Sequence, residues 1–522
     1  MIGFLDVVLR GLALSGQAIV IGGMFFAVLV LLPASRQEAT WAGRERRTLL
    51  LVAIGAAIVI LAQATSVALQ LGTLVHELGS PVEAALVTGY FRASIAKIVI
   101  AALVVAVSLA IRRRRDPRQG WPIVIGLGVL LALGAAWTSH AAARLEHRAP
   151  LLALDALHQL AAGVWIGGLL HLIVAASPDR GHPWPGVLLR RFSATSFAAV
   201  LILCASGAGL AFYYIDGWRA VLGTGYGLMV LTKVVMLGGL ALLGATNFFA
   251  VRRLAASPDM SLVRLRRFVE VELGVGLTVF FAAASLTSLP PAIDVVTDRA
   301  TPAEVGTRFT PRWPSFKSPS IDALPVADRE APRTDEDRAW SEYNHHVAGL
   351  FVLAMGVLAI LNRLGVRGAR HWPLVFLAMA VFLLVRDDPG SWPLGPQGFW
   401  EGFTYAEVLQ HRLFVLLVVG FGVFEWMVRT DRLLSPRCAL VFPILCVVGG
   451  GLLLTHSHAS LNLKAEYLIE VTHAPLGVVA LMVGCARWLE LRLPGGQHSV
   501  AGRLWATGLT VIGVMLFFYR ES

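Results

Sequence analysis

The sequence predicts an all-α, polytopic membrane protein with about fourteen transmembrane helices. Hydrophobic residues make up 56% of the 522 residues, charged residues only 15%, and the mean hydropathy is +0.69. A soluble chain of this length carries far more charge. Its apolar runs are mostly long enough to cross the hydrocarbon core of a bilayer, about 30 Å thick, as helices. Arginine gathers in every second connection between these runs, as it does in multi-pass proteins.

The fourteen expected spans have uneven lengths. The run at 372–386 is the weakest, because a crossing helix normally needs roughly 17–25 residues. The first run is too long for the core of a signal peptide and lacks a convincing cleavage site, so we expect it to be retained. The spans lie near 6–32, 48–72, 90–111, 121–140, 150–175, 194–215, 225–250, 267–289, 344–362, 372–386, 405–428, 438–455, 466–489 and 501–519.

The arginine distribution predicts the orientation. Clusters such as Arg112 to Arg115 and Arg252-Arg253 follow odd-numbered spans, whereas the loops after even-numbered spans hold far fewer basic residues. By the positive-inside rule the odd loops are cytoplasmic and both termini lie on the outer face. The formal net charge of +11 is therefore a consequence of topology. We expect a lipid bilayer, and no nucleic acid, as its surroundings.

An internal repeat is predicted in residues 1–290, with copies at 1–140 and 150–290. The segments VTGYFRASIAKIVI and GTGYGLMVLTKVVM share Thr-Gly-Tyr and a lysine seven residues after the tyrosine. Four spans separate the copies, so the halves run in the same direction as a parallel tandem repeat of four spans. The matched residues are Tyr90 with Lys97, Tyr226 with Lys233, and the glycine pair Gly22-Gly23 with Gly167-Gly168.

Two interpretations of the matched lysines stay open. They either snorkel to the interface or pair with a carboxylate, or they line a functional pathway. The Gly167-Gly168 pair is expected to let another helix approach closely. Asn247 is expected to bond a neighbouring helix, and Glu270 and Glu272 to form interfacial ion pairs with the nearby arginines.

Residues 291–342 interrupt the apolar pattern with prolines and mixed charges. We expect a Pro-rich linker on the outer face. It divides the eight-span unit from a six-span, histidine-containing unit at 343–522.

Histidine is distributed unevenly between the two faces. On this topology ten of the fourteen histidines lie at or near the outer face. In the first unit His140 and His158 reach one level, and Asp155 could orient a ligating ring. His171 lies thirteen residues after His158, about 20 Å along a helix, and is a second station or an interfacial residue. In the second unit the expected ligands are His345, His346, His411, His456, His458 and His473.

Imidazole ligands suit copper, zinc, iron and nickel. The sequence has no HExxH or clustered Cys/His with an acid that would indicate a zinc enzyme, and no nucleotide motif, so we expect no catalytic residues and no enzyme. A copper site with N and O ligands is compatible. Two histidines on facing helices could equally hold haem b.

The chain also resembles a known family. The segments LDALHQLAAGVWIGGLLHL, RRFSATSFAAVLILCASGAGL, LGTGYGLMVLTKVVMLGGLALLGATNFFAVRR and RRFVEVELGVGL are similar to those of the copper resistance protein D family. EYNHHVAGL, GFWEGFTYAEVLQHRLFVLL and LLLTHSHASLNLKAEYLIEVTHAPLG resemble the extension of its longer members. The family is a bacterial inner-membrane group linked to copper uptake and tolerance. Among the candidate ligands, His158 is the one that the resemblance supports.

The resemblance implies copper transport, copper homeostasis and resistance, with copper taken from periplasmic carriers through outer-face histidines and with both termini periplasmic. Two alternatives remain. One is a membrane redox protein that binds haem b or copper. The other is an accessory factor that delivers copper to another membrane enzyme.

Overall fold

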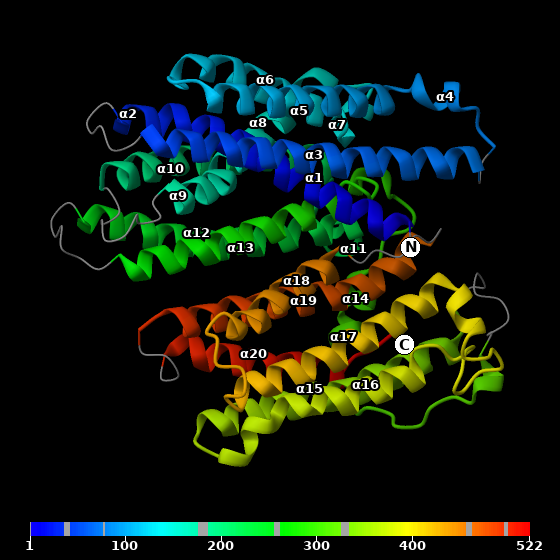
Figure 1. The fold of residues 1–522 in the computed structure, drawn as a ribbon. Helices are drawn as coiled ribbons and strands as arrows, with labels where there is room; N and C mark the ends of the chain where they lie inside the picture. Colours follow the sequence, from blue (N-terminus) through cyan, green and yellow to red (C-terminus); the bar gives the residue numbers. More distant parts are fainter. Residues whose placement is uncertain are drawn as a thin grey trace. The chain divides into compact units, whose positions relative to one another are not determined.

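The computed structural model describes residues 2–35, 42–76, 79–175, 186–254, 262–324, 333–455, 462–494 and 499–521. The chain divides into two compact units. The first holds Ile2–Thr297, and the second holds Asp298–His456 together with Ser460–Ser522. Each is a bundle of long helices (Figure 1).

In the first unit the long helices are consecutive along the chain, with short helical segments between some of them. Two spans contain a π-helical stretch, η1 and η4, that joins two α-helices. The elements are α1 (Ile2–Phe25), η1 (Phe26–Leu31), α2 (Leu32–Ser35), α3 (Ala42–His76), α4 (Val82–Leu86), α5 (Gly89–Arg113), η3 (Arg118–Gly120), α6 (Trp121–Ala136), α7 (His140–Ala143), α8 (Arg148–Ala162), η4 (Gly163–Gly167), α9 (Gly168–Ala175), α10 (Gly186–Tyr214), α11 (Trp218–Gly223), α12 (Gly225–Leu254), α13 (Val263–Leu286) and η5 (Ala292–Asp294).

The second unit is also built from helices, joined by turns and by stretches without regular structure such as 311–320, with one isolated bridge between Ser391 and Gln397. Its elements are α14 (Pro302–Phe309), η6 (Ile321–Ala323), α15 (Asp335–Arg363), η7 (Arg367–Leu374), α16 (Val375–Arg386), η8 (Glu401–Thr404), α17 (Ala406–Arg429), η9 (Cys438–Leu440), α18 (Val441–Leu454), α19 (Leu463–Arg492) and α20 (Val500–Phe517).

The predicted class is confirmed. Within the described residues, thirteen helices are long and apolar enough to cross a membrane. The expected run at 372–386 is extended by η7 into a span of twenty residues, Arg367–Arg386. The shorter apolar helix is instead Cys438–Leu454. Large apolar side chains remain exposed on the helices, among them Leu61 and Leu242, which is the surface that lipid covers.

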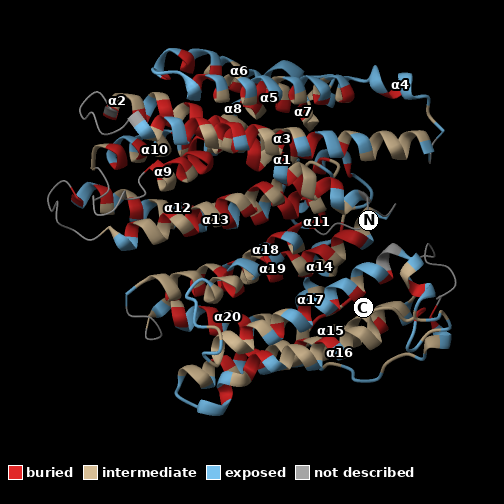
Figure 2. Ribbon diagram, viewed as in Figure 1, coloured by how far each residue is buried: buried red, intermediate tan, exposed pale blue. Residues whose placement is uncertain are grey.

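The centre of the first unit is formed by α1 and the α8–η4–α9 span. The apolar segment of the first span is 67% buried, a larger share than in any of the other twelve candidate membrane spans. Figure 2 shows the buried residues in red. A Cβ atom on Gly167 would overlap the Ala18 carbonyl oxygen, and one on Gly22 would overlap the Gly167 backbone. The expected close approach at the glycine pair is therefore confirmed. Its partner is α1, which contributes the matching glycine pair.

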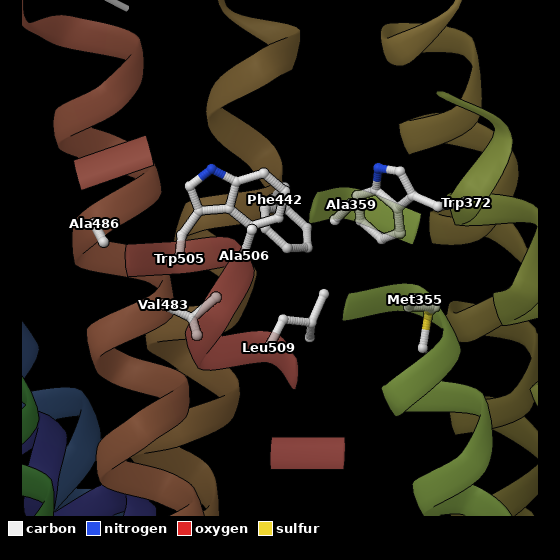
Figure 3. Close-up of a cluster of buried hydrophobic side chains, with 9 residues drawn as sticks. All are labelled: Met355, Ala359, Trp372, Phe442, Val483, Ala486, Trp505, Ala506 and Leu509. Atoms are coloured by element: carbon white, nitrogen blue, oxygen red, sulfur yellow. The ribbon is translucent and has the colours of Figure 1, made fainter. Parts of the chain in front are cut away.

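The second unit has an aromatic core at one end of its bundle. Trp372 of η7, Phe442 of α18 and Trp505 of α20 are fully buried against one another (Figure 3). The Arg429 guanidinium lies 5.2 Å from the centroids of both tryptophan rings. Its charge is balanced by Glu425, 2.6 Å away on the same helix. Aromatic faces and a carboxylate together make a buried guanidinium tolerable.

The segment predicted as a Pro-rich linker contains short helices. Thr301 and Glu304 form a capping box at the start of α14. Glu304 also accepts a hydrogen bond from Lys464, 2.7 Å away, which joins α14 to the beginning of α19. This ion pair and the capping bonds lower the pKa of the Glu304 carboxyl to about 2. The linker boundaries and the tandem repeat both stay predictions.

Candidate functional site

A cavity of about 420 Å³ lies inside the first unit. Its walls come from α1, α8, η4, α10, α12 and α13, with Ser139 and His140 at the predicted outer end. Most of the wall is apolar, so the few polar side chains define its chemistry. They are Gln17, Ser139, His140, Asp155, His158, Gln159, Tyr214, Tyr226, Lys233 and Thr287. The expected first-unit ligands His140 and His158 thus line one cavity, together with Asp155, Tyr226 and Lys233.

His158 is held in one orientation by α10. Its Nδ1 lies 3.2 Å from both the Leu203 carbonyl oxygen and the Ser206 hydroxyl. A carbonyl oxygen only accepts, so Nδ1 carries the proton and Nε2 retains a lone pair. Gly207 fits beside the imidazole, where a Cβ atom would approach the ring at 2.9 Å. The ring is therefore oriented as the second-sphere bonds of metal-ligating histidines orient theirs.

Asp155 lies one turn before His158 in a hydrogen-bond chain. The Gln159 amide donates to the Asp155 carboxylate at 2.8 Å and accepts from Gln17 of α1 at 2.9 Å. Ser139 also bonds the carboxylate, and Lys233 of α12 interacts with it electrostatically. The carboxylate and the ammonium compensate each other's charge, which lowers the cost of placing either group within the bundle.

His140 contacts two tyrosines. Its ring centroid lies 6.3 Å from that of Tyr214 and 6.1 Å from that of Tyr226. It begins the short helix α7 rather than ending the fourth span. Burial lowers the pKa of the His140 imidazole, so the ring is neutral and can offer a lone pair.

Three further candidates lie away from this cavity. Lys97 donates to Gln63 of α3 at 3.0 Å and does not line it. Tyr90 packs on its neighbour Phe91. His171 is 1% exposed, its Nε2 lies 2.9 Å from the Ile19 carbonyl oxygen, and its ring stacks on Phe26.

In the second unit, His345 of α15 and His473 of α19 come together. Their ring centroids are 5.8 Å apart. Each Nδ1 lies 2.8 Å from a carbonyl oxygen one turn earlier in its own helix, at Ser341 and Ile469, so both rings retain a free Nε2 lone pair. Tyr519 packs against both rings, at 3.9 Å and 5.5 Å between centroids, which leaves no space between them for a porphyrin.

The other expected ligands in this unit have different surroundings. Both nitrogens of His346 lie near backbone carbonyl oxygens, of Ser315 and Tyr519, so its ring has no free lone pair directed elsewhere. His411 bonds Asp388 at 2.9 Å. Burial raises the pKa of the adjacent Asp387 carboxyl to about 6. His456 and His458 lie outside the described residues.

The predicted interfacial ion pair is confirmed for Glu270, which contacts Arg266 and Arg267, and is wrong for Glu272. Glu272 faces the bundle, where it accepts from Trp165 at 2.7 Å and from Asn247 at 2.8 Å. The predicted interhelical bond of Asn247 is thereby confirmed. Helical periodicity could have predicted that Glu272 and Glu270 have different surroundings, because positions 270 and 272 point to different faces of the helix.

Within the described residues, no three His, Cys, Asp or Glu side chains converge as a closed metal site. The arrangement provides pairs of imidazoles instead. Open, incomplete ligand sets suit an ion that must enter and leave.

The fold defines a multi-pass helical membrane protein with a cavity inside its first unit that a few polar side chains line. Residues 186–286, which run from the start of α10 to the end of α13, match the family model described as copper resistance protein D. The chain is also 32% identical over 205 residues to the copper transport protein CutJ of Bacillus subtilis (strain 168). That match covers 37% of this chain and 36% of the relative.

The resemblance seen in the sequence is therefore confirmed: residues 186–286 are similar to the copper resistance protein D family, and the chain is similar to a copper transport protein. It spans about a third of the length of the curated relative it matches. No solved structure matches it. The family segment supplies Lys233 and Tyr226 to the cavity, whereas His158 precedes it.

Proposed function

We propose that this protein transports copper ions across a bacterial inner membrane, and that the cavity around His158 is the entry site on the periplasmic side. The observation that carries the proposal is the cavity itself. Inside a membrane-spanning unit, it brings together a ring with a free Nε2, a second neutral imidazole and a carboxylate. Imidazole and carboxylate groups are ligands that copper accepts. The similarity to a copper transport protein supports copper as the cargo.

The proposed route begins near His140, where α6, α10 and α13 end. A periplasmic copper carrier would release its ion there, with both termini of this chain on the same side. His158 then binds the ion one level deeper. The Lys233 ammonium opposes a second positive charge in the cavity, so it limits how tightly the ion is held. The protein acts in copper homeostasis and resistance and is not an enzyme.

The test is copper uptake into vesicles that contain only the purified protein. We expect His158→Gln to lower the initial rate on the order of tenfold or more, because it removes the oriented Nε2 ligand. The matched control is His147→Gln, an exposed histidine at the predicted outer end that does not line the cavity. Equal rates in the two variants would exclude His158 as an entry ligand.

The same preparation separates the alternatives. A protein that only hands copper to another enzyme gives no uptake in vesicles that lack that enzyme. A haem b protein shows a Soret band when purified. Copper uptake by a colourless preparation is the result expected here.

A further inference from the structure

A second cavity, of about 330 Å³, lies deeper in the first unit, toward the predicted cytoplasmic ends of its helices. It is lined mainly by apolar side chains of η4, α9, α10, α12 and α13. Its polar lining consists of Ser193, Ser196, Asn247, Glu272 and the Trp165 indole. Among the described residues, Trp165 is the one that lines both this cavity and the cavity around His158, hereafter the copper cavity. The indole thus separates the two spaces.

Glu272 is an acid without a cationic partner in the described residues. Glu272 is only 3% exposed. Its two carboxylate oxygens each accept one hydrogen bond, from the neutral donors Trp165 and Asn247. A carboxylate buried within a membrane bundle normally pairs with a cation, because its desolvation is costly. A carboxyl group that lacks such a partner reduces this cost by binding a proton.

Several charged and titratable groups on the elements packed around Glu272 have other contacts. On its own helix, Arg266 and Arg267 contact Glu270. From α9, His171 is directed at the Ile19 carbonyl oxygen. From α12, the Arg252 guanidinium lies 4.6 Å from the centroid of the Phe248 ring.

The surroundings of Glu272 can satisfy both of its protonation states. The Trp165 indole only donates, so it requires an acceptor oxygen in each state. Asn247 can donate through its amide nitrogen to the carboxylate, or accept the carboxylic O–H after its amide turns over. Ser196 lines the same cavity, and its buried Oγ has no hydrogen-bond partner within the part of the chain that the structure describes.

Copper binding at this position is a weaker interpretation than proton binding. The group offers only carboxylate, amide and hydroxyl oxygens, a set that suits hard cations, whereas copper sites with oxygen ligands also contain nitrogen ligands. Within the described lining of this cavity there is no histidine or cysteine.

We propose that Glu272 is a proton-binding site that Trp165 couples to the copper cavity. The coupling, but not the proton site, rests on the proposed copper transport. Binding converts the carboxylate and one proton into a carboxylic acid with its O–H directed to Asn247. The charge-assisted bond from Trp165 then becomes a neutral one, roughly half as strong. The indole that separates the two cavities is held less firmly when Glu272 is protonated.

The local helix geometry suits such a change. Trp165 lies within the π-helical stretch Gly163–Gly167, and such stretches are frequent at functional sites. His158 is seven residues earlier on the same continuous span, and both residues line the cavity around His158. A shift of this span would act on the copper ligand and on Trp165 together.

The first test uses the full chain without copper and measures infrared difference spectra as a function of pH. We expect a protonated-carboxyl band that titrates in the wild type and in Glu270→Gln, and that is lost in Glu272→Gln. Trp165→Phe removes a donor to the carboxylate, so its band should titrate at higher pH. This shift keeps the test valid if Glu272→Gln does not fold. A band retained in Glu272→Gln, or unmoved in Trp165→Phe, would overturn the proton site.

The second test measures copper uptake into vesicles with and without an imposed pH difference. The wild type and Glu270→Gln should respond to the pH difference. Glu272→Gln should lose that response while it still binds copper in the first cavity. A pH response that survives in Glu272→Gln would overturn the coupling. Absence of uptake in the wild type, with the titrating band present, would refute copper transport and leave the proton site standing.

Discussion

At the scale of single residues, equivalent positions have different surroundings. Lys97 and Lys233 occupy matching positions in the predicted repeat. Lys97 is bonded to Gln63, whose amide in turn donates to Ser94 at 3.2 Å. Lys233 lines the cavity around His158 and interacts with Asp155. We therefore propose a structural role for Lys97 and a pathway role for Lys233, which divides between them the two interpretations that the sequence left open.

This difference makes the two lysines a matched pair for mutation. We expect Lys233→Met to change copper uptake severalfold without lowering the amount of folded protein, because its ammonium acts on an ion in the cavity. Lys97→Met should lower the folded yield, because it leaves the buried Gln63 carbonyl without its donor, a loss of about 1–3 kcal/mol.

Size-exclusion profiles of detergent extracts measure the folded yield, and vesicle uptake per folded molecule measures transport. A Lys233→Met protein that is lost from the membrane would assign this lysine a structural role as well.

At the scale of elements, the central contact of the first unit is the crossing of α1 with η4. It depends on glycine at both sides, since Gly22 and Gly167 allow the two backbones to touch. The contact positions Trp165 and His158, which are on the same span. Each of these two glycine-containing spans also has a π-helical stretch, at Phe26–Leu31 and Gly163–Gly167.

We expect Gly167→Ala to lower the thermal stability of the detergent-solubilised protein, because the new Cβ atom meets the Ala18 backbone. Overpacking of this kind costs about 1–3 kcal/mol. The control is Gly239→Ala in α12, where a Cβ atom meets nothing within 4 Å. It should leave the apparent Tm unchanged or slightly raised. An apparent Tm in Gly167→Ala equal to that of the control would contradict this packing.

At the scale of the whole molecule, the chain has two compact units, and each contains a pair of histidines that come from different helices. His140 and His158 line the cavity of the first unit. His345 and His473 meet beside Tyr519 in the second. In each pair at least one ring is anchored through Nδ1 and has a free Nε2, so the same ligand chemistry is available twice.

We therefore expect two copper ions per molecule at saturation. Replacing His345 and His473 together by Gln should lower the stoichiometry to about one, because it removes the imidazole pair of the second unit. His411→Gln, whose ring bonds Asp388 instead, should leave the stoichiometry unchanged. Metal analysis of the purified variants gives the numbers. An unchanged stoichiometry in the double variant would exclude this pair as a site.

The sequence predicted the surroundings of some site residues better than those of others. Grouping His140, His158 and Asp155 needed only helix periodicity and span direction, because consecutive antiparallel spans return to the same level. The sequence did not place Tyr226 and Lys233 with them, although both line the same cavity. Glu272 was misassigned because its neighbours in sequence are arginines, whereas its partners Trp165 and Asn247 come from other spans. His346 could not be distinguished from His345, because their difference lies in the carbonyl oxygens that face each ring.

The sequence by itself determined the helical membrane class and the similarity to the copper resistance protein D family. Both depend on properties that are local in the chain: the length of apolar runs, the spacing of charges and short motifs. Only the tertiary structure decided that Trp165 stands between two cavities and that Glu272 faces one of them. Those facts depend on how far each helix rotates about its axis and on which helices it meets, and these follow from packing among residues far apart in the sequence.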